Sequence, residues 1–126
     1  MCGILGGFSN EEIDKYEFDH HLSLIRHRGP DSRGSYISND KKLYFGHTRL
    51  AILDLSSSGA QPMHSSCGRY VLAYNGEIYN HNQLRRDLKK EGVAPSWRGQ
   101  SDTETLLAAI VHWGLDKALS RSKGMF

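Results

Sequence analysis

This chain of 126 residues lacks long apolar runs, has too few cysteines for a disulfide framework, and carries little net charge. Without a run of about 18 apolar residues no transmembrane helix is expected, and the first residues do not resemble a signal peptide. The two cysteines give no disulfide framework, and the seven histidines form no zinc-binding pattern. A net charge of +2 is too small to indicate nucleic-acid binding. These absences favour a cytoplasmic protein with no membrane or nucleic-acid partner and no metal site of its own.

The composition that remains is that of a globular domain. Hydrophobic residues make up 38% of the chain and charged residues 24%, which is typical of folded proteins rather than disordered ones. The length suits one domain or part of one. We therefore treat residues 1–126 as a single domain, with no linker and no internal repeat.

The first part of the chain predicts a strand followed by a helix. Residues 3–8 form a short apolar run that suits a buried strand. Ser9 and Glu12 fit a capping box, so a helix is expected from there to about Ile25. The Arg-Gly-Pro-Asp turn at 28–31 then ends it.

Strand patterns dominate the middle of the chain. Residues 35–37 and 43–49 should pair around the turn at 39–42. Residues 50–55 continue with nearly alternating apolar positions, and residues 69–75 alternate again.

Helix patterns return in the last part. One helix is expected at 82–91 and another at 102–113, where Ser101 and Glu104 again fit a capping box. Residues 122–126 look like the beginning of a strand. We therefore expect the chain to be incomplete at its C-terminus, as a fragment of a longer protein.

Cys2 is the most informative single residue. If Met1 is removed, Cys2 carries both a thiol and a free α-amine. The amine can then act as base for its own neighbouring nucleophile, which is the arrangement of N-terminal-nucleophile hydrolases. A buried structural cysteine is the alternative interpretation.

Several short motifs occur in an order that resembles the glutamine-hydrolysing domain of class II glutamine amidotransferases. They are Met-Cys-Gly-Ile at 1–4, Arg-Gly-Pro-Asp at 28–31, Asn-Gly-Glu at 75–77 and Ser-Asp-Thr-Glu at 101–104. Two longer stretches are similar to the asparagine synthetase branch: 46–54, leading to Gln-Pro-Met at 61–63, and 74–80. The resemblance spans essentially the whole chain.

This resemblance implies catalytic roles for three residues. Cys2 would attack the side-chain amide of glutamine, forming a glutamyl thioester and ammonia, and water would then release glutamate. The side-chain amide of Asn75 and the backbone N–H of Gly76 would form the oxyanion hole. The residues alone leave an alternative open, because Asn-Gly is also a strong signal for a tight hairpin turn.

The resemblance also implies a binding pocket for glutamine. Arg49 would hold the α-carboxylate through its fork of donors, and Leu50 and Ile52 would line the pocket. Asp102 and Glu77 would face the α-ammonium. An exposed residue at a strand end is the alternative interpretation of Arg49. For Asp102, the sequence alone favours an ordinary acid at a helix N-terminus.

Other residues are expected to be structural. Arg28 would support the nucleophile as part of its turn, and Cys67 matches no motif. Trp97 and Trp113 are interpreted as packing residues. The basic run at 85–90 is interpreted as a solvated helix face.

The fold implied by the resemblance is α+β, an αββα sandwich of two antiparallel sheets flanked by helices, as in N-terminal-nucleophile hydrolases. In related full-length enzymes a C-terminal synthetase domain uses ATP and Mg²⁺ with the ammonia to make asparagine. Its pyrophosphate loop is absent from this sequence, so no cofactor is expected in this chain. The expected partners are glutamine and that synthetase domain, while a homodimer stays open. Two alternatives also remain, a different acceptor such as a sugar or another carboxylate, and a non-catalytic fragment.

Overall fold

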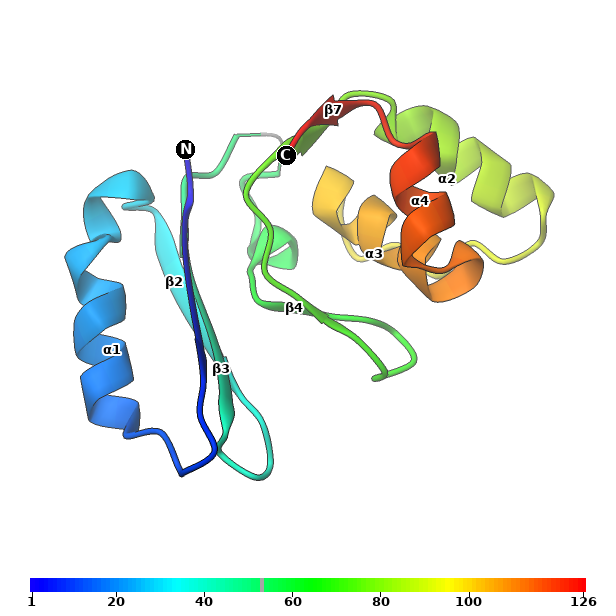
Figure 1. Cartoon of the computed structure of the whole chain (residues 1–126). Helices are drawn as coiled ribbons and strands as arrows, with labels where there is room; N and C mark the ends of the chain where they lie inside the picture. The colour runs from blue at the N-terminus through cyan, green and yellow to red at the C-terminus, as the bar shows by residue number, and fades with distance from the viewer. Residues whose placement is uncertain (53) are drawn as a thin grey trace. The chain divides into compact units, whose positions relative to one another are not determined.

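Two compact units make up the structure, a computed structural model that describes residues 1–52 and 54–126 (Figure 1). The first unit contains Met1–Ala51, Ala60–Pro62 and Ala73–Asn75. The second unit contains Ile52–Gly59, Met63–Leu72 and Gly76–Phe126. Helices and antiparallel strands occur in the chain, in agreement with the expected α+β class. Among the described residues, no helix has the length and apolar character needed to cross a membrane.

A three-stranded antiparallel sheet forms the centre of the first unit. Its strands are β1 (Gly3–Phe8), β2 (Ser32–Ile37) and β3 (Leu43–Arg49), in the order β1-β3-β2. The register pairs Gly3 with Thr48 across β1 and β3. The expected strands at 3–8, 35–37 and 43–49 are therefore confirmed, although β2 begins earlier than predicted.

One helix, α1 (Lys15–Leu24), covers one face of this sheet (Figure 1). Its buried residues are Phe18 and Leu22, and the Phe18 ring lies 5.1 Å from the ring of Tyr44 on β3. Gly46 permits this packing because a Cβ there would lie 2.8 Å from Leu22 Cδ1. A larger residue at 46 would force the side chains of Leu22 and Phe18 to shift.

The start of α1 differs from the prediction. Asp14 is the N-cap, and its carboxylate accepts hydrogen bonds from the backbone of Tyr16 and Glu17. The prediction of a capping box formed by Ser9 and Glu12 was therefore wrong. The backbone of residues 9–13 bonds to the hairpin turn instead, through Ser9 N to Lys42 O and Ile13 N to Lys41 O, both 3.0 Å. Tertiary contacts therefore delay the helix until the next capping residue.

Side chains rather than a strand partner hold the segment before Asn75. His47 Nε2 lies 3.1 Å from Tyr74 O, and Tyr74 N donates to Gln61 Oε1 at 2.6 Å. The predicted strand at 69–75 was therefore too long. Only Val71–Leu72 (β5) pairs, with Met63–His64 (β4).

Three helices build most of the second unit: α2 (His81–Lys90), α3 (Asp102–Trp113) and α4 (Leu115–Arg121). The helices expected at 82–91 and 102–113 are confirmed, whereas α4 was not predicted. The unit also contains a short 3₁₀ helix, η2 (Ser57–Gly59), and β6 (Glu77–Ile78) paired with β7 (Gly124–Met125). The strand expected near the end of the chain is thus confirmed as β7. The buried apolar residues of this unit include Ile78, Leu84, Leu88, Leu106, Leu107, Ala109, Ile110 and Ala118.

Two further predictions need correction. The described part of 50–55 contains no strand, and Leu53 lies outside the described residues. Ser101 does cap α3, since its hydroxyl accepts from Thr103 N at 3.1 Å. Glu104, however, does not complete a capping box. Its carboxylate accepts instead from the backbone of Arg98 and Gly99, in the loop that precedes the helix.

The buried His47 should make the stability of the first unit depend on pH. Burial lowers the pKa of His47 from its ordinary value of 6.5, the hydrogen bond to Tyr74 opposes this, and the charge of Arg49 adds to it. The unfolded chain therefore takes up a proton where folded His47 stays neutral, and the free energy of unfolding falls as pH drops below about 6.5.

We expect His47→Gln to flatten this fall, measured by urea unfolding between about pH 7.5 and pH 5. Gln can still donate to Tyr74 O, but it does not titrate. His20→Gln, at an exposed histidine on α1, is the matched control. An unchanged slope in His47→Gln would contradict a neutral buried imidazole.

Candidate functional site

The residues implied in catalysis and binding divide between the two units. Cys2, Arg49, Leu50 and Asn75 belong to the first unit. The others, Ile52, Gly76, Glu77 and Asp102, belong to the second. Each group is described within its own unit.

The thiol of Cys2 lies at the end of β3. Its Sγ accepts a hydrogen bond from Leu50 N at 3.3 Å and lies 3.6 Å from Leu50 O. Cys2 is half-buried and directly precedes β1. Arg49 is the last residue of β3 and is only 9% exposed. The structure therefore places Cys2, Arg49 and Leu50 close together at the end of β3, while their roles in catalysis and binding stay a prediction.

The Arg-Gly-Pro-Asp turn at 28–31 forms hydrogen bonds with Cys2, which precedes β1, and with the backbone at the end of β3. Arg28 Nε donates to Cys2 O at 3.2 Å. Asp31 N donates to Arg49 O at 3.0 Å, and Asp31 Oδ2 accepts from Ala51 N at 2.8 Å. The supporting role expected for Arg28 and its turn is confirmed as a set of contacts to the backbone around the thiol.

Gly29 allows the turn to lie this close to the end of β3. It is buried, and a Cβ there would lie 2.2 Å from Thr48 O and 2.6 Å from the carbonyl carbon of Arg49. Real Cβ atoms do not approach backbone atoms so closely. The turn can therefore pack on the end of β3 only with glycine at this position.

Asn75 follows the segment that His47 and Gln61 fix through Tyr74. The interpretation of Asn75–Gly76 as a hairpin turn was wrong, because β5 pairs with β4 while β6 pairs with β7. Sequence reasoning gave no role to His47 or Gln61. Both lie inside the stretches that carry the resemblance, and a polar residue in a strand between Gly46 and Thr48 was the signal available.

In the second unit the carboxylate of Asp102 bonds to the backbone of β6, the strand that begins at Glu77. Asp102 Oδ2 accepts from Ile78 N at 2.8 Å, which places Asp102 beside Glu77. Asp102 is 6% exposed, so it is not an ordinary solvated acid at a helix start. Ile52, by contrast, is 68% exposed, and Gly76 is also exposed.

Asn80 fixes the strand on which Glu77 lies. Its Oδ1 accepts from Lys123 N at 2.7 Å, and its Nδ2 donates to Arg121 O at 2.9 Å. Tyr79 N donates to Lys123 O at 2.7 Å, which extends the pairing of β6 with β7. Asn80 was part of the motif at 74–80 but had no predicted role.

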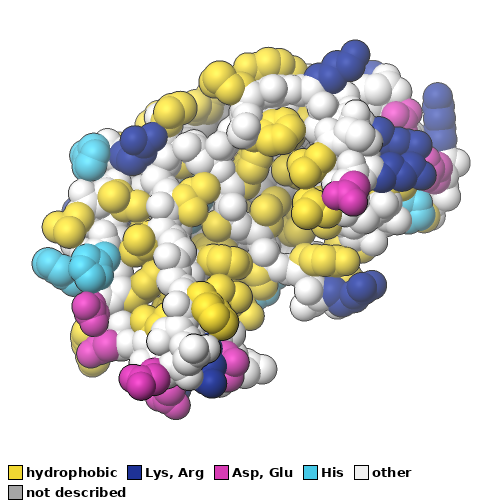
Figure 2. Space-filling view, in the orientation of Figure 1, with side chains coloured by type: hydrophobic (Ala, Val, Ile, Leu, Met, Phe, Trp, Pro, Cys, Tyr) yellow, Lys and Arg dark blue, Asp and Glu magenta, His cyan; other side chains and the backbone are white. Residues whose placement is uncertain are grey.

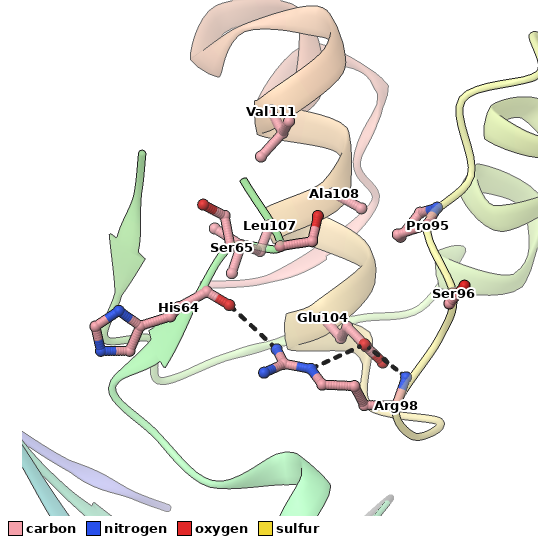
Figure 3. Close-up of a pocket in the computed structure, with 10 residues that line it drawn as sticks. His64, Ser65, Pro95, Ser96, Arg98, Glu104, Leu107, Ala108 and Val111 are labelled. Carbon is pink, nitrogen blue, oxygen red and sulfur yellow. Dashed lines mark hydrogen bonds and ion pairs between the residues drawn. The ribbon is translucent and has the colours of Figure 1, made fainter. Parts of the chain in front are cut away.

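A buried carboxylate organises the loop that leads to Asp102 (Figure 3). Glu104 Oε1 accepts from Arg98 N at 2.8 Å, and Glu104 Oε2 accepts from Gly99 N at 3.2 Å. Arg98 also donates to His64 O at 3.2 Å. These groups border a small cavity of about 100 Å³, whose other walls include Ser65, Pro95, Leu107 and Val111.

Arg85 departs from the predicted solvated basic face, whose other basic residues, Arg86, Lys89 and Lys90, are exposed as expected. Its guanidinium lies 4.0 Å from the centre of the Trp97 ring, and its side chain is 17% exposed. Burial lowers the pKa of Arg85, while the charges of Glu104 and Asp54 oppose that shift. Trp97 is a packing residue, as expected.

No group of three or more histidine, cysteine, aspartate or glutamate residues is placed to hold a metal ion in the described ranges 1–52 and 54–126. The second thiol, Cys67, is exposed in the other unit from Cys2. A hydrogen bond from the Ser65 hydroxyl lowers the pKa of Cys67, with smaller help from the backbone of Arg69.

A family model, the glutamine amidotransferase domain, matches residues 1–126. The chain belongs to this family. Asparagine synthetase [glutamine-hydrolyzing] 1 of Bacillus subtilis is 37% identical over 131 residues, covering 100% of this chain and 20% of that protein. The protein of the same name in Saccharomyces cerevisiae is 50% identical over 90 residues, covering 69% of this chain and 15% of its own length.

A third relative has a different name. Amidase chry2 of Gibberella zeae is 37% identical over 123 residues, which cover 98% of this chain and 17% of that protein. This chain spans only a fifth or less of the length of these three relatives. The resemblance to the asparagine synthetase branch is confirmed by the two synthetases.

Replacing Gly29 by alanine should disrupt the packing of the turn at 28–31 on the end of β3. The added Cβ must displace the backbone at Thr48 and Arg49, so we expect the free energy of unfolding to fall by about 1–3 kcal/mol. Gly6→Ala is the matched control in the same unit, because a Cβ there meets nothing closer than 3.9 Å. Urea unfolding of both variants tests this expectation. Equal stabilities for the two would show that the turn does not pack tightly on β3.

Proposed function

We propose that this domain hydrolyses the side-chain amide of glutamine to glutamate and ammonia, with Cys2 as an N-terminal nucleophile after removal of Met1. The supporting observation is the thiol of Cys2, held by the backbone of Leu50 at the end of β3. A thiol fixed by main-chain groups keeps one position, as a nucleophile requires. The Arg28 contact to Cys2 O restrains the same residue from the other side.

The chemistry follows from two groups on one residue. The α-amine of processed Cys2 takes the thiol proton, and the thiolate attacks the amide carbon. The amide C–N bond breaks, the proton goes to the leaving nitrogen, and ammonia departs from a glutamyl thioester. Water then attacks the thioester, with the same amine as base, and glutamate leaves. While Met1 is attached, the nitrogen of Cys2 is an amide and cannot act as base.

The oxyanion of each tetrahedral intermediate needs preorganised donors. We assign the side-chain amide of Asn75 and the N–H of Gly76 to this role. In support, the residue before Asn75 is fixed at both its N–H and its C=O, by Gln61 and His47. A rigid backbone at this point lowers the cost of orienting the donors.

The amino-acid end of glutamine needs both kinds of charge. Arg49, at the end of β3 next to the thiol, is assigned to the α-carboxylate, with Leu50 and Ile52 lining the pocket. Glu77 and Asp102 are assigned to the α-ammonium. The bond from Ile78 N occupies one oxygen of Asp102 and orients the carboxylate, so the other oxygen remains for the ligand.

The whole protein would use the ammonia in an ATP-dependent synthetase domain that amidates aspartate, as the names of two relatives suggest. ATP and Mg²⁺ belong to that domain. The relative named an amidase keeps a second acceptor open.

We also assign the domain to the N-terminal-nucleophile sandwich. Gly46 faces α1, so the neighbouring positions of β3 and their partners on β1 face away from that helix. On that face Ile4 is 44% and Phe8 75% exposed. Apolar side chains are also visible at the surface in Figure 2. An apolar sheet face of this kind suits packing against a second sheet.

Cys2→Ala should abolish glutamine hydrolysis, because it removes the nucleophile. Intact-mass measurement with a glutamine-mimicking diazoketone tests this directly. We expect loss of Met1 and one adduct on Cys2 in the wild type, and no adduct in Cys2→Ala. Cys67→Ala is the matched control and should still be labelled once.

Three outcomes would count against the proposal. Undiminished turnover in Cys2→Ala would refute the cysteine mechanism. Labelling lost in Cys67→Ala would move the nucleophile to the other thiol. A purified protein that keeps Met1 and takes no adduct would indicate a non-catalytic module.

Arg49→Ala should chiefly weaken glutamine binding. Losing the bidentate contact to the α-carboxylate should raise KM by about tenfold or more, while kcat changes less. Arg49→Lys keeps the positive charge but loses the two-pronged guanidinium, so its KM should lie between that of the wild type and that of Arg49→Ala. Steady-state ammonia release measures both constants. An unchanged KM would remove Arg49 from the binding site.

A further inference from the structure

We propose that Arg85 is a positioning residue for the α-ammonium of glutamine: it fixes the loop 97–101 and thereby the carboxylate of Asp102. This inference rests on the proposed function of the same site. Arg85 lies on α2 and touches none of the reacting groups. Its effect would pass through the backbone that leads into α3.

The guanidinium of Arg85 binds this loop at several points. Its Nη1 donates to Gly99 O and its Nη2 to Ser101 O, both at 3.1 Å, and its Nε donates to Thr105 Oγ1 at 2.7 Å. The planar fork of arginine can reach all three acceptors at once, which an ammonium group cannot do.

The flat face of the same guanidinium is also used. It lies 4.0 Å from the centre of the Trp97 ring, at the other end of the loop. A cation over an indole face is attracted by the ring electrons, more strongly when water is excluded. Arg85 therefore holds the loop by its edge and by its face.

Glu104 completes the arrangement from inside α3. Its carboxylate accepts from the backbone N–H of Arg98, as Figure 3 shows, and from that of Gly99. The same carboxylate lies 3.6 Å from Arg85 Nη2. Both partners of this ion pair are largely buried, at 17% and 7% side-chain exposure. The charge of Glu104 keeps the guanidinium in place, and the guanidinium balances a carboxylate that is costly to bury alone.

The consequence reaches Asp102 through one residue. Ser101 is the N-cap of α3, and its carbonyl is the acceptor that Arg85 holds. Asp102 follows it directly and accepts from Ile78 N at 2.8 Å. A shift of the loop by about 1 Å would misplace the carboxylate against both Ile78 and the ammonium, and such shifts reduce rates by large factors.

The test separates positioning from general destabilisation by comparing two substrates. Glutaramate is glutamine without its α-amino group, so it makes no contact that depends on Asp102. We expect Arg85→Gln to lower kcat/KM for glutamine by about tenfold, through KM, and for glutaramate by less than about twofold. Arg85→Lys should recover only part of the loss.

Two control variants accompany it. Arg86→Gln changes the neighbouring arginine, whose Nη2 donates to Oε1 of the exposed Gln83 at 2.7 Å. This variant should hydrolyse both substrates as the wild type does. Leu88→Ala removes a buried side chain from the same helix and should lower stability without discriminating between the substrates. Hydrogen exchange at the Ile78 amide should accelerate in Arg85→Gln but not in Arg86→Gln, independently of any activity.

The outcomes distinguish the two proposals. Equal losses for glutamine and glutaramate in Arg85→Gln, or an unchanged Ile78 amide, would overturn the role of Arg85 while leaving the proposed function intact. A processed wild-type protein that hydrolyses neither substrate would overturn the proposed function itself. Selective loss of glutamine turnover with faster Ile78 exchange supports the inference.

Discussion

The close packing of the turn at 28–31 on the end of β3 is the constraint on which the first unit depends. Without a side chain at Gly29, the turn reaches backbone distance from Thr48 and Arg49. Arg28 and Asp31 then bond to the chain on both sides of that contact. The thiol of Cys2 receives its hydrogen bond from the next residue of the same backbone. One steric condition therefore sets the position of Cys2, of Arg49 and of the residues after Arg49.

In the second unit, two charged side chains rather than a glycine hold an irregular segment in place. A loop without regular structure precedes α3, and its backbone groups need partners. Glu104 supplies acceptors for the N–H groups of Arg98 and Gly99, while Arg85 supplies donors for the carbonyls of Gly99 and Ser101. Two opposite charges facing one loop satisfy both kinds of backbone group. The acidic start of α3 is therefore held more firmly than a surface helix end would be.

Much of the fold could be predicted, because local patterns decide where regular elements end. Gly92 and Gly114, both at positive φ, mark the ends of α2 and α3. The turn at 39–42 indicated where β2 ends and β3 begins. The errors come from distant partners. Helix α1 begins later than predicted because the backbone of the residues before Asp14 bonds to the hairpin turn. Strand β5 ends earlier than predicted because the N–H and C=O of Tyr74 bond to the side chains of Gln61 and His47 instead of to a strand.

The site shows the same division. Motifs identified which residues to expect, since Cys2, Arg49 and Asp102 all lie in matched segments. They did not show how these residues are held. A capping box looks the same in sequence whether its glutamate reaches back to the cap or out to an upstream loop, as Glu104 does. Likewise, a basic run on a helix gives no sign that Arg85 faces a tryptophan and three acceptors in another segment.

The contacts of the Cys2 thiol have a consequence for sequence variation. Both hydrogen-bond partners are main-chain atoms of Leu50, an N–H and a C=O that nearly every amino acid would supply. The side chain at position 50 can thus change without removing either contact to the sulfur. Proline is the exception, because it has no N–H to donate. The position of the sulfur and the identity of the side chain at position 50 can therefore evolve separately, although both depend on the same residue.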